Sequence, residues 1–275
     1  MPRVCPLPES PFLHDLRVLG HRAGVETARA VWSGRPVFVK RLRPGDGLAR
    51  ACLTHEGAVA ARLSRPEAHH PGLVPLLTAG QDALIFPWIT GGTLRDTLET
   101  GPLPLGEALA VARGLLEALA HVHAQGVVHH DLKPENVLLC GGERRAGAVR
   151  LADFGLSHAR SLPDPHGAEA RLGTPHYMAP EQFAGVRGDP RSDLYAVGAV
   201  LFECLAGHPP YAEPLGWLAG HRRDRSPLPG PRALHPILEA TLHRDPAERP
   251  PCALTLGRQL RAAARTLGEA ERPCP

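Results

Sequence analysis

The spacing of hydrophobic residues changes once along this chain, close to the pair Gly91-Gly92. Before that pair, short apolar runs rich in β-branched residues are separated by Gly- and Pro-containing turns, which predicts five strands. They lie at 16–19, 28–32, 37–42, 73–77 and 83–89, and a helical stripe over 48–63 interrupts them. Strands first and helices later predict an α+β fold of two unequal lobes, the smaller with a five-stranded antiparallel sheet and one helix.

The rest of the chain has the pattern of packed helices. Apolar residues recur there at spacings of three and four, as they do on the buried face of a helix. The predicted helices lie at 105–119, 194–205, 234–242 and 254–267. Two short strands within 137–151, joined by a turn-rich stretch, predict a hairpin.

Composition limits what this chain can be. With 43% hydrophobic and 21% charged residues it is a globular chain rather than a disordered or fibrous one. The most apolar stretch, 196–202, is far shorter than the roughly 20 residues of a membrane-spanning helix, so we expect no span. Six scattered cysteines and the lack of a signal-peptide block favour a cytoplasmic protein. A net charge of +3 and an arginine cluster without interleaved aromatics disfavour a nucleic-acid partner.

The basic residues are unevenly chosen. Among the 31 Lys and Arg residues only Lys40 and Lys133 are lysines, and Asn136 is the single asparagine of the chain. Arginine is a wide planar fork, whereas lysine is a compact charge on a flexible stem. We therefore expect that Lys40, Lys133 and Asn136 cannot be replaced by another residue without loss of function.

Two of them belong to one segment, His129-His130-Asp131-Leu132-Lys133-Pro134-Glu135-Asn136, and Asp153-Phe154-Gly155 follows it. The order and spacing of these motifs resemble the catalytic loop and metal-binding triplet of the eukaryotic-type protein kinase family. The resemblance runs from about 19 to 249 and implies a protein-kinase-like fold with ATP and Mg²⁺ as cofactors. It also implies transfer of the γ-phosphoryl group of ATP to Ser or Thr of a protein substrate, because Lys-Pro-Glu is typical of Ser/Thr kinases.

The resemblance sets the expected domain limits. We expect a kinase domain over 12–270, with a small lobe at 12–89 and a large lobe at 90–270. The Pro-rich segment 1–11 and the end of the chain, 271–275, are expected to be disordered tails.

The catalytic chemistry can also be argued from the residues. A hairpin between Asn136 and Asp153 would bring an amide oxygen and a carboxylate to the same end of two strands, and such hard oxygen ligands suit Mg²⁺. Asp131 could then face the acceptor hydroxyl, and Lys133 could reach the γ-phosphate as a point charge. The resemblance gives the same roles: Asp131 and Lys133 catalytic, Asn136 and Asp153 metal-binding.

Lys40 ends an apolar strand and matches the family's lysine that holds the α- and β-phosphates. Its expected partner is Glu56, whose carboxylate lies on an apolar helix stripe and is costly to bury without a cation. Taken alone, either side chain could be a solvated surface group. The resemblance adds further nucleotide contacts: Leu19, Gly20, Thr27, Phe38, Phe86, Pro87, Ile89 and Leu138.

The segment 173–181 resembles the end of a Ser/Thr kinase activation segment. By this resemblance Thr174 would position the substrate, Glu181 would pair with Arg249, and Asp193 would brace the catalytic loop. Each of the last two contacts could equally be an ordinary surface ion pair.

Some positions depart from the family pattern. Gly20 keeps the first glycine of the glycine-rich loop, but Arg22 and Val25 replace the other two, and Phe38 stands where a small alanine is usual. These changes leave open two alternatives: a pseudokinase that serves as a nucleotide-sensing scaffold, and a small-molecule, antibiotic-type phosphotransferase. His130 replaces the arginine that pairs with a phosphorylated loop residue, so we expect activity that does not depend on activation-loop phosphorylation.

Overall fold

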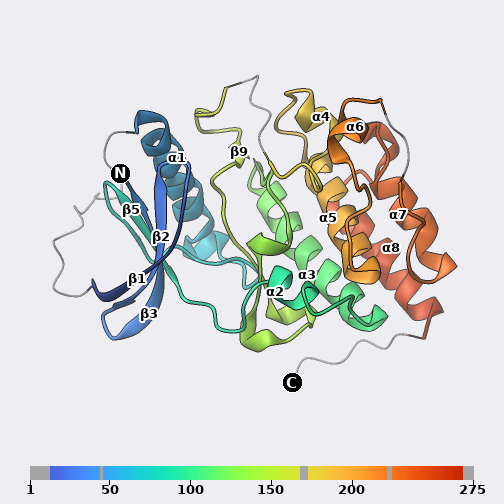
Figure 1. Ribbon diagram of the computed structural model, residues 1–275, viewed down its shortest axis with the longest axis horizontal. Coiled ribbons are helices and arrows are strands. Elements are labelled where there is room, and N and C mark those ends of the chain that lie inside the picture. The colour runs from blue at the N-terminus through green and yellow to red at the C-terminus, as the bar shows by residue number, and fades with distance from the viewer. Residues whose placement is uncertain (1–12, 44–45, 168–172, 222–224, 269–275) are drawn as a thin grey trace.

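The structure, a computed structural model, describes residues 13–43, 46–167, 173–221 and 225–268. The expected tails at 1–11 and 271–275, and the outer limits at 12 and 270, lie outside the described residues. Figure 1 shows the strands of residues 13–42 and 83–87 gathered with α1 (Gly47–Leu63) at one end of the molecule, and the remaining helices, together with β9 (His158–Ala159), at the other. This arrangement confirms the α+β prediction of a small sheet-containing lobe (the N-lobe) and a larger helical one (the C-lobe).

The N-lobe contains one five-stranded sheet in the order β1-β2-β3-β5-β4, in which every neighbouring pair is antiparallel. The strands are β1 (Leu13–Arg22), β2 (Val25–Trp32), β3 (Arg35–Leu42), β4 (Thr78–Ala79) and β5 (Ala83–Pro87). Two-residue turns join the first three strands. Both residues of each turn have positive φ, 46° and 74° at Ala23-Gly24 and 50° and 76° at Ser33-Gly34. Such turns match the natural twist of a β-hairpin.

The predicted strand at 73–77 is wrong. Only Leu73 makes a bridge there, to Leu151, and the strand that joins the sheet, β4, begins directly after this segment, at Thr78. Pro75 cannot donate a ladder hydrogen bond, and neighbouring N–H groups bond elsewhere, Val74 to Leu151 O at 3.0 Å and Leu77 to Ile85 O at 2.9 Å. The segment therefore joins the sheet to the C-lobe instead of extending the sheet.

Helix α1 (Gly47–Leu63) packs on the sheet. It begins where the Asp46 side chain accepts a hydrogen bond from Ala49 N at 2.9 Å, and it ends at Ser64, whose hydroxyl donates to Ala60 O at 2.7 Å. Its buried face includes Leu53, Val59 and also Glu56. A charged residue on the core side of α1 is thus fixed by the same periodicity that buries the leucines.

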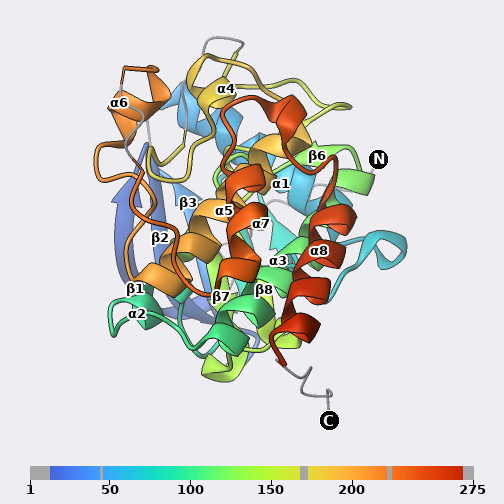
Figure 2. The same cartoon turned by 90° about the vertical axis from the view of Figure 1, so that its right-hand side faces the viewer.

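Helices make up most of the C-lobe, and Figure 2 shows four of them, α3, α5, α7 and α8, side by side. The helices are α2 (Leu94–Leu98), α3 (Leu105–Ala124), α4 (Pro180–Phe183), α5 (Pro190–Ala206), α6 (Pro214–Leu218), α7 (His235–Thr241) and α8 (Ala253–Thr266). Helix α5 is buried along nearly its whole length, as expected for a helix surrounded by other elements. No helix of the described ranges is long and apolar enough to cross a membrane.

Two small hairpin-like pairs complete the C-lobe. Strand β7 (Val137–Leu139) pairs with β8 (Val149–Leu151), and β6 (Val127–Val128) pairs with β9 (His158–Ala159). The first pair is the predicted hairpin. One large apolar cluster fills the C-lobe, whereas the N-lobe has two smaller ones on the two faces of its sheet.

Candidate functional site

Lys40, near the end of β3, has its ammonium group between two carboxylates. Its Nζ lies 2.6 Å from Glu56 Oε1 of α1 and 2.8 Å from Asp153 Oδ1, just after β8. Lys40 is 8% exposed and Glu56 4%, whereas the Asp153 side chain is 40% exposed. The pair with Glu56 is the one the sequence led us to expect. Because the three side chains come from both lobes, they also hold the lobes together.

The charges of this group are set by burial and by its neighbours. Burial alone would lower the pKa of Lys40, but the carboxylates of Asp153 and Glu56 outweigh it and raise the pKa. For Asp153, burial is outweighed by Lys40 and by the Gly155 N–H, and the pKa is lowered. Burial raises the pKa of Glu56, and Lys40 offsets this only in part. Asp153 is therefore the firmly ionised carboxylate of the group.

The hairpin of β7 and β8 brings Asn136 and Asp153 together. Val137 is opposite Leu151, so the residue before one strand and the residues after the other lie at the same end. The Ala152 N–H also donates to Asn136 O at 3.0 Å. Asp153 has a φ of 65°, a left-handed conformation that Asp tolerates better than most residues. Two oxygen-bearing side chains that are distant in the sequence are neighbours here.

Asp131 lies at the centre of a second polar group. Lys133 Nζ donates to Asp131 Oδ2 at 2.6 Å and to Thr174 Oγ1 at 3.0 Å, and Thr174 Oγ1 lies 3.4 Å from Asp131 Oδ1. Asn136 Nδ2 donates to Asp131 O at 2.8 Å, which leaves the amide oxygen of Asn136 as the end available to a cation. A carboxylate, an ammonium group and a hydroxyl from two segments thus converge on one point.

Asp193 of α5 binds the backbone of the loop that precedes Asp131. Its two carboxylate oxygens accept from His129 N at 2.8 Å and His130 N at 2.9 Å, and His123 Nε2 lies 2.8 Å from Oδ2. Asp193 is 1% exposed. Burial opposes its ionisation, but the hydrogen bond with His123 and nearby histidines outweigh burial and lower the pKa of Asp193 to about 2. An ionised, buried carboxylate fixes the residues just before Asp131.

The side chain of His130 is buried as well. Its Nε2 accepts from the Gly188 N–H at 2.9 Å, which requires the neutral imidazole, and its Nδ1 has no hydrogen-bond partner among the described residues. Burial lowers the pKa of His130 to about 4, with Asp193 opposing and Arg187 adding to the shift. His130 therefore links the catalytic loop to the start of α5 without carrying a charge.

Apolar side chains expected to contact a purine lie together between the lobes. Phe86 belongs to the cluster that faces α1, and Phe38, Ile89 and Leu138 pack against the same cluster. Phe38 and Phe86 are register partners on β3 and β5, and Pro87 pairs with Val37. The large Phe38 ring thus occupies space on the same side of the sheet as the other three.

The tip of the β1–β2 hairpin, which corresponds to the glycine-rich loop of the resemblance, packs against α1. Gly20 pairs with Thr27, whose hydroxyl donates to Gly20 O at 3.3 Å, and Leu19 lies at a bulge with 54% of its surface exposed. A Cβ on Gly24 would lie 2.6 Å from Ala49 Cβ, so the tip of the hairpin packs closely on the start of α1. Gly24, which does not match a family glycine, is thus needed for this close approach.

The described residues between Asp153 and Thr174, which together with 173–181 correspond to the activation segment of the resemblance, make contacts that the sequence did not reveal. Asp164 Oδ2 accepts from Arg187 Nε at 2.5 Å and lies 3.3 Å from His158 Nδ1, while Asp164 Oδ1 accepts from His166 N at 3.0 Å. Both ring nitrogens of His55 on α1 lie near carbonyl oxygens of the segment, 3.1 Å from Pro163 O and 3.0 Å from Ser157 O. No local pattern signals the ion pair of Asp164 with Arg187 or the contacts of His55, because these partners are 23 and 102 to 108 positions apart.

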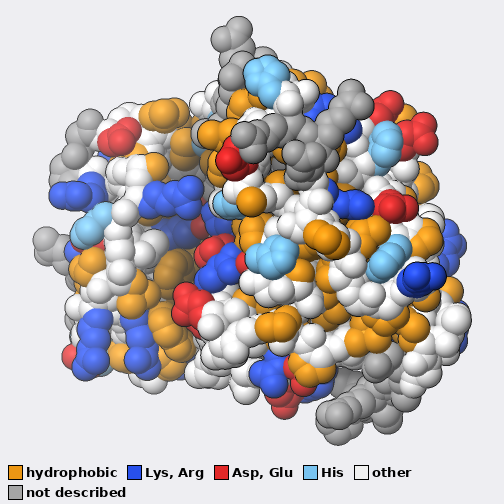
Figure 3. All heavy atoms as spheres, turned by 45° about the vertical axis from the view of Figure 1, so that its right-hand side comes forward, with side chains coloured by type: hydrophobic (Ala, Val, Ile, Leu, Met, Phe, Trp, Pro, Cys, Tyr) orange, Lys and Arg blue, Asp and Glu red, His pale blue; other side chains and the backbone are white. Residues whose placement is uncertain are grey.

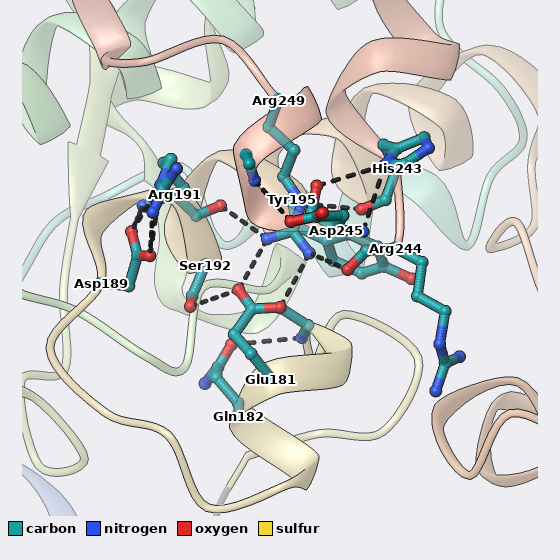
Figure 4. A network of polar contacts seen from close by, with 12 residues as sticks. Glu181, Gln182, Asp189, Arg191, Ser192, Tyr195, His243, Arg244, Asp245 and Arg249 are labelled. Atoms are coloured by element: carbon teal, nitrogen blue, oxygen red, sulfur yellow. Dashed lines mark hydrogen bonds and ion pairs between the residues drawn. The ribbon is translucent and has the colours of Figure 1, made fainter.

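Figure 4 shows the network in which Arg249 meets Glu181. Arg249 Nη1 donates to Glu181 Oε1 at 2.6 Å and Nη2 to Oε2 at 2.8 Å, and Ser192 Oγ donates to Glu181 Oε1 at 2.7 Å. The Arg249 side chain is fully buried, and its guanidinium also lies over the Tyr195 ring at 5.0 Å. This is a buried bidentate pair, unlike the surface pair that the sequence left open.

The surface shows where the charged groups of the molecule gather. In Figure 3, side chains of both charge signs lie where the two lobes meet. A cavity of about 720 Å³ lies elsewhere, between α6 and α7, and is lined by residues such as Tyr211, Trp217 and Arg244. None of the residues predicted for the site lines this cavity.

Comparison with known proteins agrees with this geometry. The chain is 35% identical over 251 residues to serine/threonine-protein kinase pkn2 of Myxococcus xanthus, across 84% of this chain and 29% of that protein. It is 34% identical over 262 residues to serine/threonine-protein kinase PknL of Mycobacterium bovis, across 92% of this chain and 61% of that protein. With the DNA damage-responsive serine/threonine-protein kinase RqkA of Deinococcus radiodurans, the identity is 41% over 185 residues, across 64% and 27%.

The chain thus spans less than two thirds of the length of these relatives. The protein kinase domain family itself matches residues 19–256, which is most of the chain. That range contains β2 to β5 and the end of β1, α1, the β7–β8 hairpin and both polar groups described above. The chain belongs to the protein kinase domain family.

Proposed function

We propose that this protein is an ATP-dependent kinase that phosphorylates Ser and Thr side chains of proteins. The observation that carries the proposal is the convergence of two polar groups at the junction of the lobes: Lys40 with Glu56 and Asp153, and Asp131 with Lys133. The names of the relatives, all serine/threonine-protein kinases, support the same reaction class.

In this proposal the nucleotide lies between the lobes. The apolar side chains of Phe38, Phe86, Ile89 and Leu138 enclose the base, and Lys40 holds the α- and β-phosphates while Glu56 keeps its ammonium group in place. Leu19, Gly20 and Thr27 cover the nucleotide from β1 and β2, and Pro87 lies beside the base. Because Asp153 already neutralises Lys40 in part, the bound phosphates would compete with it for the same cation.

The two expected metal ligands, Asn136 and Asp153, are suited to Mg²⁺. Asn136 offers an amide oxygen and Asp153 a carboxylate of lowered pKa, and both are hard oxygen donors. Two protein ligands are few, which is the usual arrangement where phosphates and water complete the shell. The ion, when bound, supplies positive charge to the β- and γ-phosphates.

The residues around Asp131 prepare the acceptor. The Asp131 carboxylate orients the Ser or Thr hydroxyl and accepts its proton as the new O–P bond forms and the bond from the γ-phosphorus to the departing ADP oxygen breaks. Lys133, already 2.6 Å from Asp131, stabilises the migrating phosphoryl group. Thr174 holds the peptide close to both groups.

We also propose that activation-loop phosphorylation is not needed. His130 is buried and neutral, so it cannot form an ion pair with a phosphorylated loop residue as an arginine would. Asp164 carries a carboxylate that Arg187 and His158 already bind, and this contact supports the segment without phosphate. Ser161 is one of the few hydroxyl residues between Asp153 and Glu181 that could accept a phosphate. Ser161→Ala is expected to retain transfer, and abolished transfer in a folded variant would contradict this part of the proposal.

A scaffold without catalysis is the second candidate. It is favoured by Phe38, which fills space among the base-contacting residues, and by the hairpin tip that packs on α1 near Gly24. A thermal-shift measurement addresses nucleotide binding, because a ligand that binds only the native state raises the midpoint. MgATP is expected to raise it.

The deciding experiment is transfer of labelled phosphate from ATP to a generic protein substrate and to peptides. Wild type should transfer label and Asp131→Asn should not, although both should bind nucleotide. Equal background signal from the two proteins would refute catalysis. Label on a small-molecule acceptor but on no peptide would instead favour the antibiotic-type alternative.

A further inference from the structure

The amide side chain of Gln182, the third residue of α4, joins this helix to the catalytic loop. Its Nε2 donates to His130 O at 2.9 Å, and its Oε1 accepts from Ala179 N at 3.2 Å. Because one partner is a carbonyl and the other an N–H group, only this orientation of the amide satisfies both. Gln182 is 4% exposed, so both contacts are shielded from water. Figure 4 shows its side chain beside Glu181 on the same short helix.

The carbonyl that Gln182 binds belongs to a residue with an unfavourable backbone conformation. His130 has a φ of 63°, in the left-handed region that a residue with a Cβ rarely adopts. Such a conformation persists only where the surrounding structure holds it. The Asp193 carboxylate accepts from the His130 N–H at 2.9 Å, and the Gln182 amide donates to the His130 carbonyl. The two contacts fix His130 on both sides, and with it the peptide bond that leads into Asp131.

The orientation of that peptide bond decides where the Asp131 carboxylate lies. The Asp131 N–H donates to His129 Nδ1 at 3.2 Å, and the carboxylate accepts from Lys133 Nζ at 2.6 Å. A rotation of the peptide plane between His130 and Asp131 would move the carboxylate relative to Lys133. A displacement of about 1 Å in a catalytic group can lower the rate about a hundredfold. The hydrogen bond to the His130 carbonyl therefore matters for more than the stability of the loop.

Helix α4 is a firm support for this hydrogen bond. The residue before Gln182 is Glu181, which forms the buried bidentate pair with Arg249. The activation segment touches the same carbonyl, because a Cβ on Gly173 would lie 3.4 Å from His130 O. Gln182 thus lies where the segment that would hold the substrate peptide meets the loop that carries the catalytic carboxylate.

We propose that Gln182 is a positioning residue for phosphoryl transfer, which sets the Asp131 carboxylate through the carbonyl of His130. The inference rests on the proposed kinase activity, because this position matters only if Asp131 accepts the substrate proton. The NH₂ group of Gln182 carries the role, whereas its amide oxygen holds the start of α4. Exchange to glutamate separates the two, since a carboxylate keeps the acceptor and loses the donor. A protonated carboxyl group offers both.

The test compares wild type, Gln182→Glu and a matched control, Gln259→Glu on the exposed side of α8. Rates are measured from about pH 8.5 to about pH 5.5, across which a buried carboxyl group titrates. At the alkaline end kcat of Gln182→Glu should be about tenfold or more below wild type, with KM for ATP unchanged. As the pH falls, the introduced carboxyl group gains a proton that it donates to His130 O, and the ratio of the two kcat values should rise towards one. The ionisable groups around the contact, among them His130, Asp193 and Glu181, are common to both proteins, so the ratio cancels their titrations.

Gln182→Met keeps the length of the side chain but has neither the donor nor the acceptor. It should lose about tenfold in kcat at every pH, without recovery in acid. A wild-type kcat in Gln182→Met, or a rate ratio of folded Gln182→Glu that does not change with pH, would refute the positioning role. If Gln182→Glu does not fold, the kcat of Gln182→Met decides. If neither variant folds, Gln182 serves stability rather than positioning, which also overturns the proposal.

Urea unfolding of the same proteins gives a readout that is independent of catalysis. Burial and the facing carbonyl should raise the pKa of the introduced carboxyl group above its value in the unfolded chain. The free energy of unfolding of Gln182→Glu should therefore be lowest at alkaline pH and recover as the pH falls through the raised pKa, whereas Gln259→Glu should show no recovery. If wild type transfers no phosphate, the kinase proposal fails and the positioning role fails with it, even where the recovery is seen. An active wild type without this recovery refutes the role of Gln182 alone.

Discussion

At the scale of single residues, Lys40 shows why a chain so rich in arginine retains lysine. Its Nζ lies 2.6 Å from one carboxylate and 2.8 Å from another, in a setting where Lys40 is 8% exposed. A guanidinium is wider than an ammonium group and cannot place its charge at that point without moving Glu56 or Asp153. The scarcity of lysine in the sequence is therefore explained by geometry at this position.

Lys40→Arg is expected to keep the fold but to lower phosphoryl transfer by about a hundredfold or more, because the charge can no longer sit where the phosphates bind. Steady-state transfer rates and nucleotide affinity measure this. Arg41→Lys is the matched control, since it makes the reverse exchange on the neighbouring β3 residue, whose side chain is 46% exposed. Transfer by Lys40→Arg within a few-fold of wild type would contradict the prediction.

The lowered pKa of His130 predicts that the free energy of unfolding falls in acid. Its folded-state pKa is about 4 against 6.5 for an ordinary histidine, so the unfolded chain binds this proton first as the pH falls. The stabilising contribution is complete above about pH 6.5 and is lost between there and pH 4, which amounts to roughly 3 kcal/mol. His130→Gln keeps an acceptor for the Gly188 N–H but cannot titrate. Urea unfolding of both proteins across this range should show a shallower pH dependence for the variant, and equal dependences would refute the assignment.

At the scale of elements, the sequence predicted the helices that are several turns long and failed for short helices and for a segment whose backbone hydrogen bonds go to different partners. Helices α3, α5 and α8 were predicted because each repeats an apolar stripe over several turns. Helices α2, α4 and α6 have five, four and five residues, too few for a period to show. The strand expected at 73–77 failed because its backbone bonds to the C-lobe and to β5 at separate places.

The same distinction applies to the site. Asp131, Lys133 and Asn136 lie in one contiguous segment, so their spacing carried the prediction. The ion pair of Asp164 with Arg187 and the contacts of His55 with Ser157 and Pro163 were missed because they join residues that are 23 and 102 to 108 positions apart. Only folding brings those partners together.

The activation segment is expected to depend on the ion pair of Asp164 with Arg187. Arg187 also donates to Leu156 O at 2.8 Å, so its removal loosens the segment at two points. Arg187→Ala should lower kcat by about tenfold, the effect of losing one charged hydrogen-bonding group, with a smaller change in KM for ATP. Arg160→Ala, an exposed arginine of the same segment, is the control. The exchange Asp164→Arg with Arg187→Asp should recover part of the loss, and no recovery together with normal kcat in Arg187→Ala would refute the role.

Arg249 connects α4, α5 and the turn before α8. Because its side chain is fully buried against Glu181, Arg249→Ala leaves a carboxylate without its cation and should cost about 3–5 kcal/mol of unfolding free energy. Arg191→Ala, which removes an ion pair with Asp189 whose arginine side chain is 35% exposed, should cost less than about 1 kcal/mol. Denaturant unfolding of the two variants measures the difference, and similar values would contradict it.

At the scale of the whole molecule, the two lobes are unequally built. The C-lobe has one continuous core around α3 and α5, whereas the apolar residues of the N-lobe are divided between two faces of one sheet. A divided core buries less apolar surface per residue, so the N-lobe should open at a lower free energy than the C-lobe. The contact of Lys40 with Asp153 and the segment at 73–77 are among the links between the lobes.

Amide hydrogen exchange tests this asymmetry together with the proposed nucleotide site. Amides of β2 and β3 should exchange faster than those of α3 and α5, and MgATP should slow the N-lobe amides most, because a nucleotide between the lobes stabilises the closed arrangement. Asp131→Asn should show the same protection, since it retains every proposed nucleotide contact, whereas Asp153→Asn should show little of it with Mg²⁺ present. Uniform protection of both lobes, or protection that persists in Asp153→Asn, would mean that the nucleotide binds elsewhere and that the link between the lobes does not depend on this carboxylate.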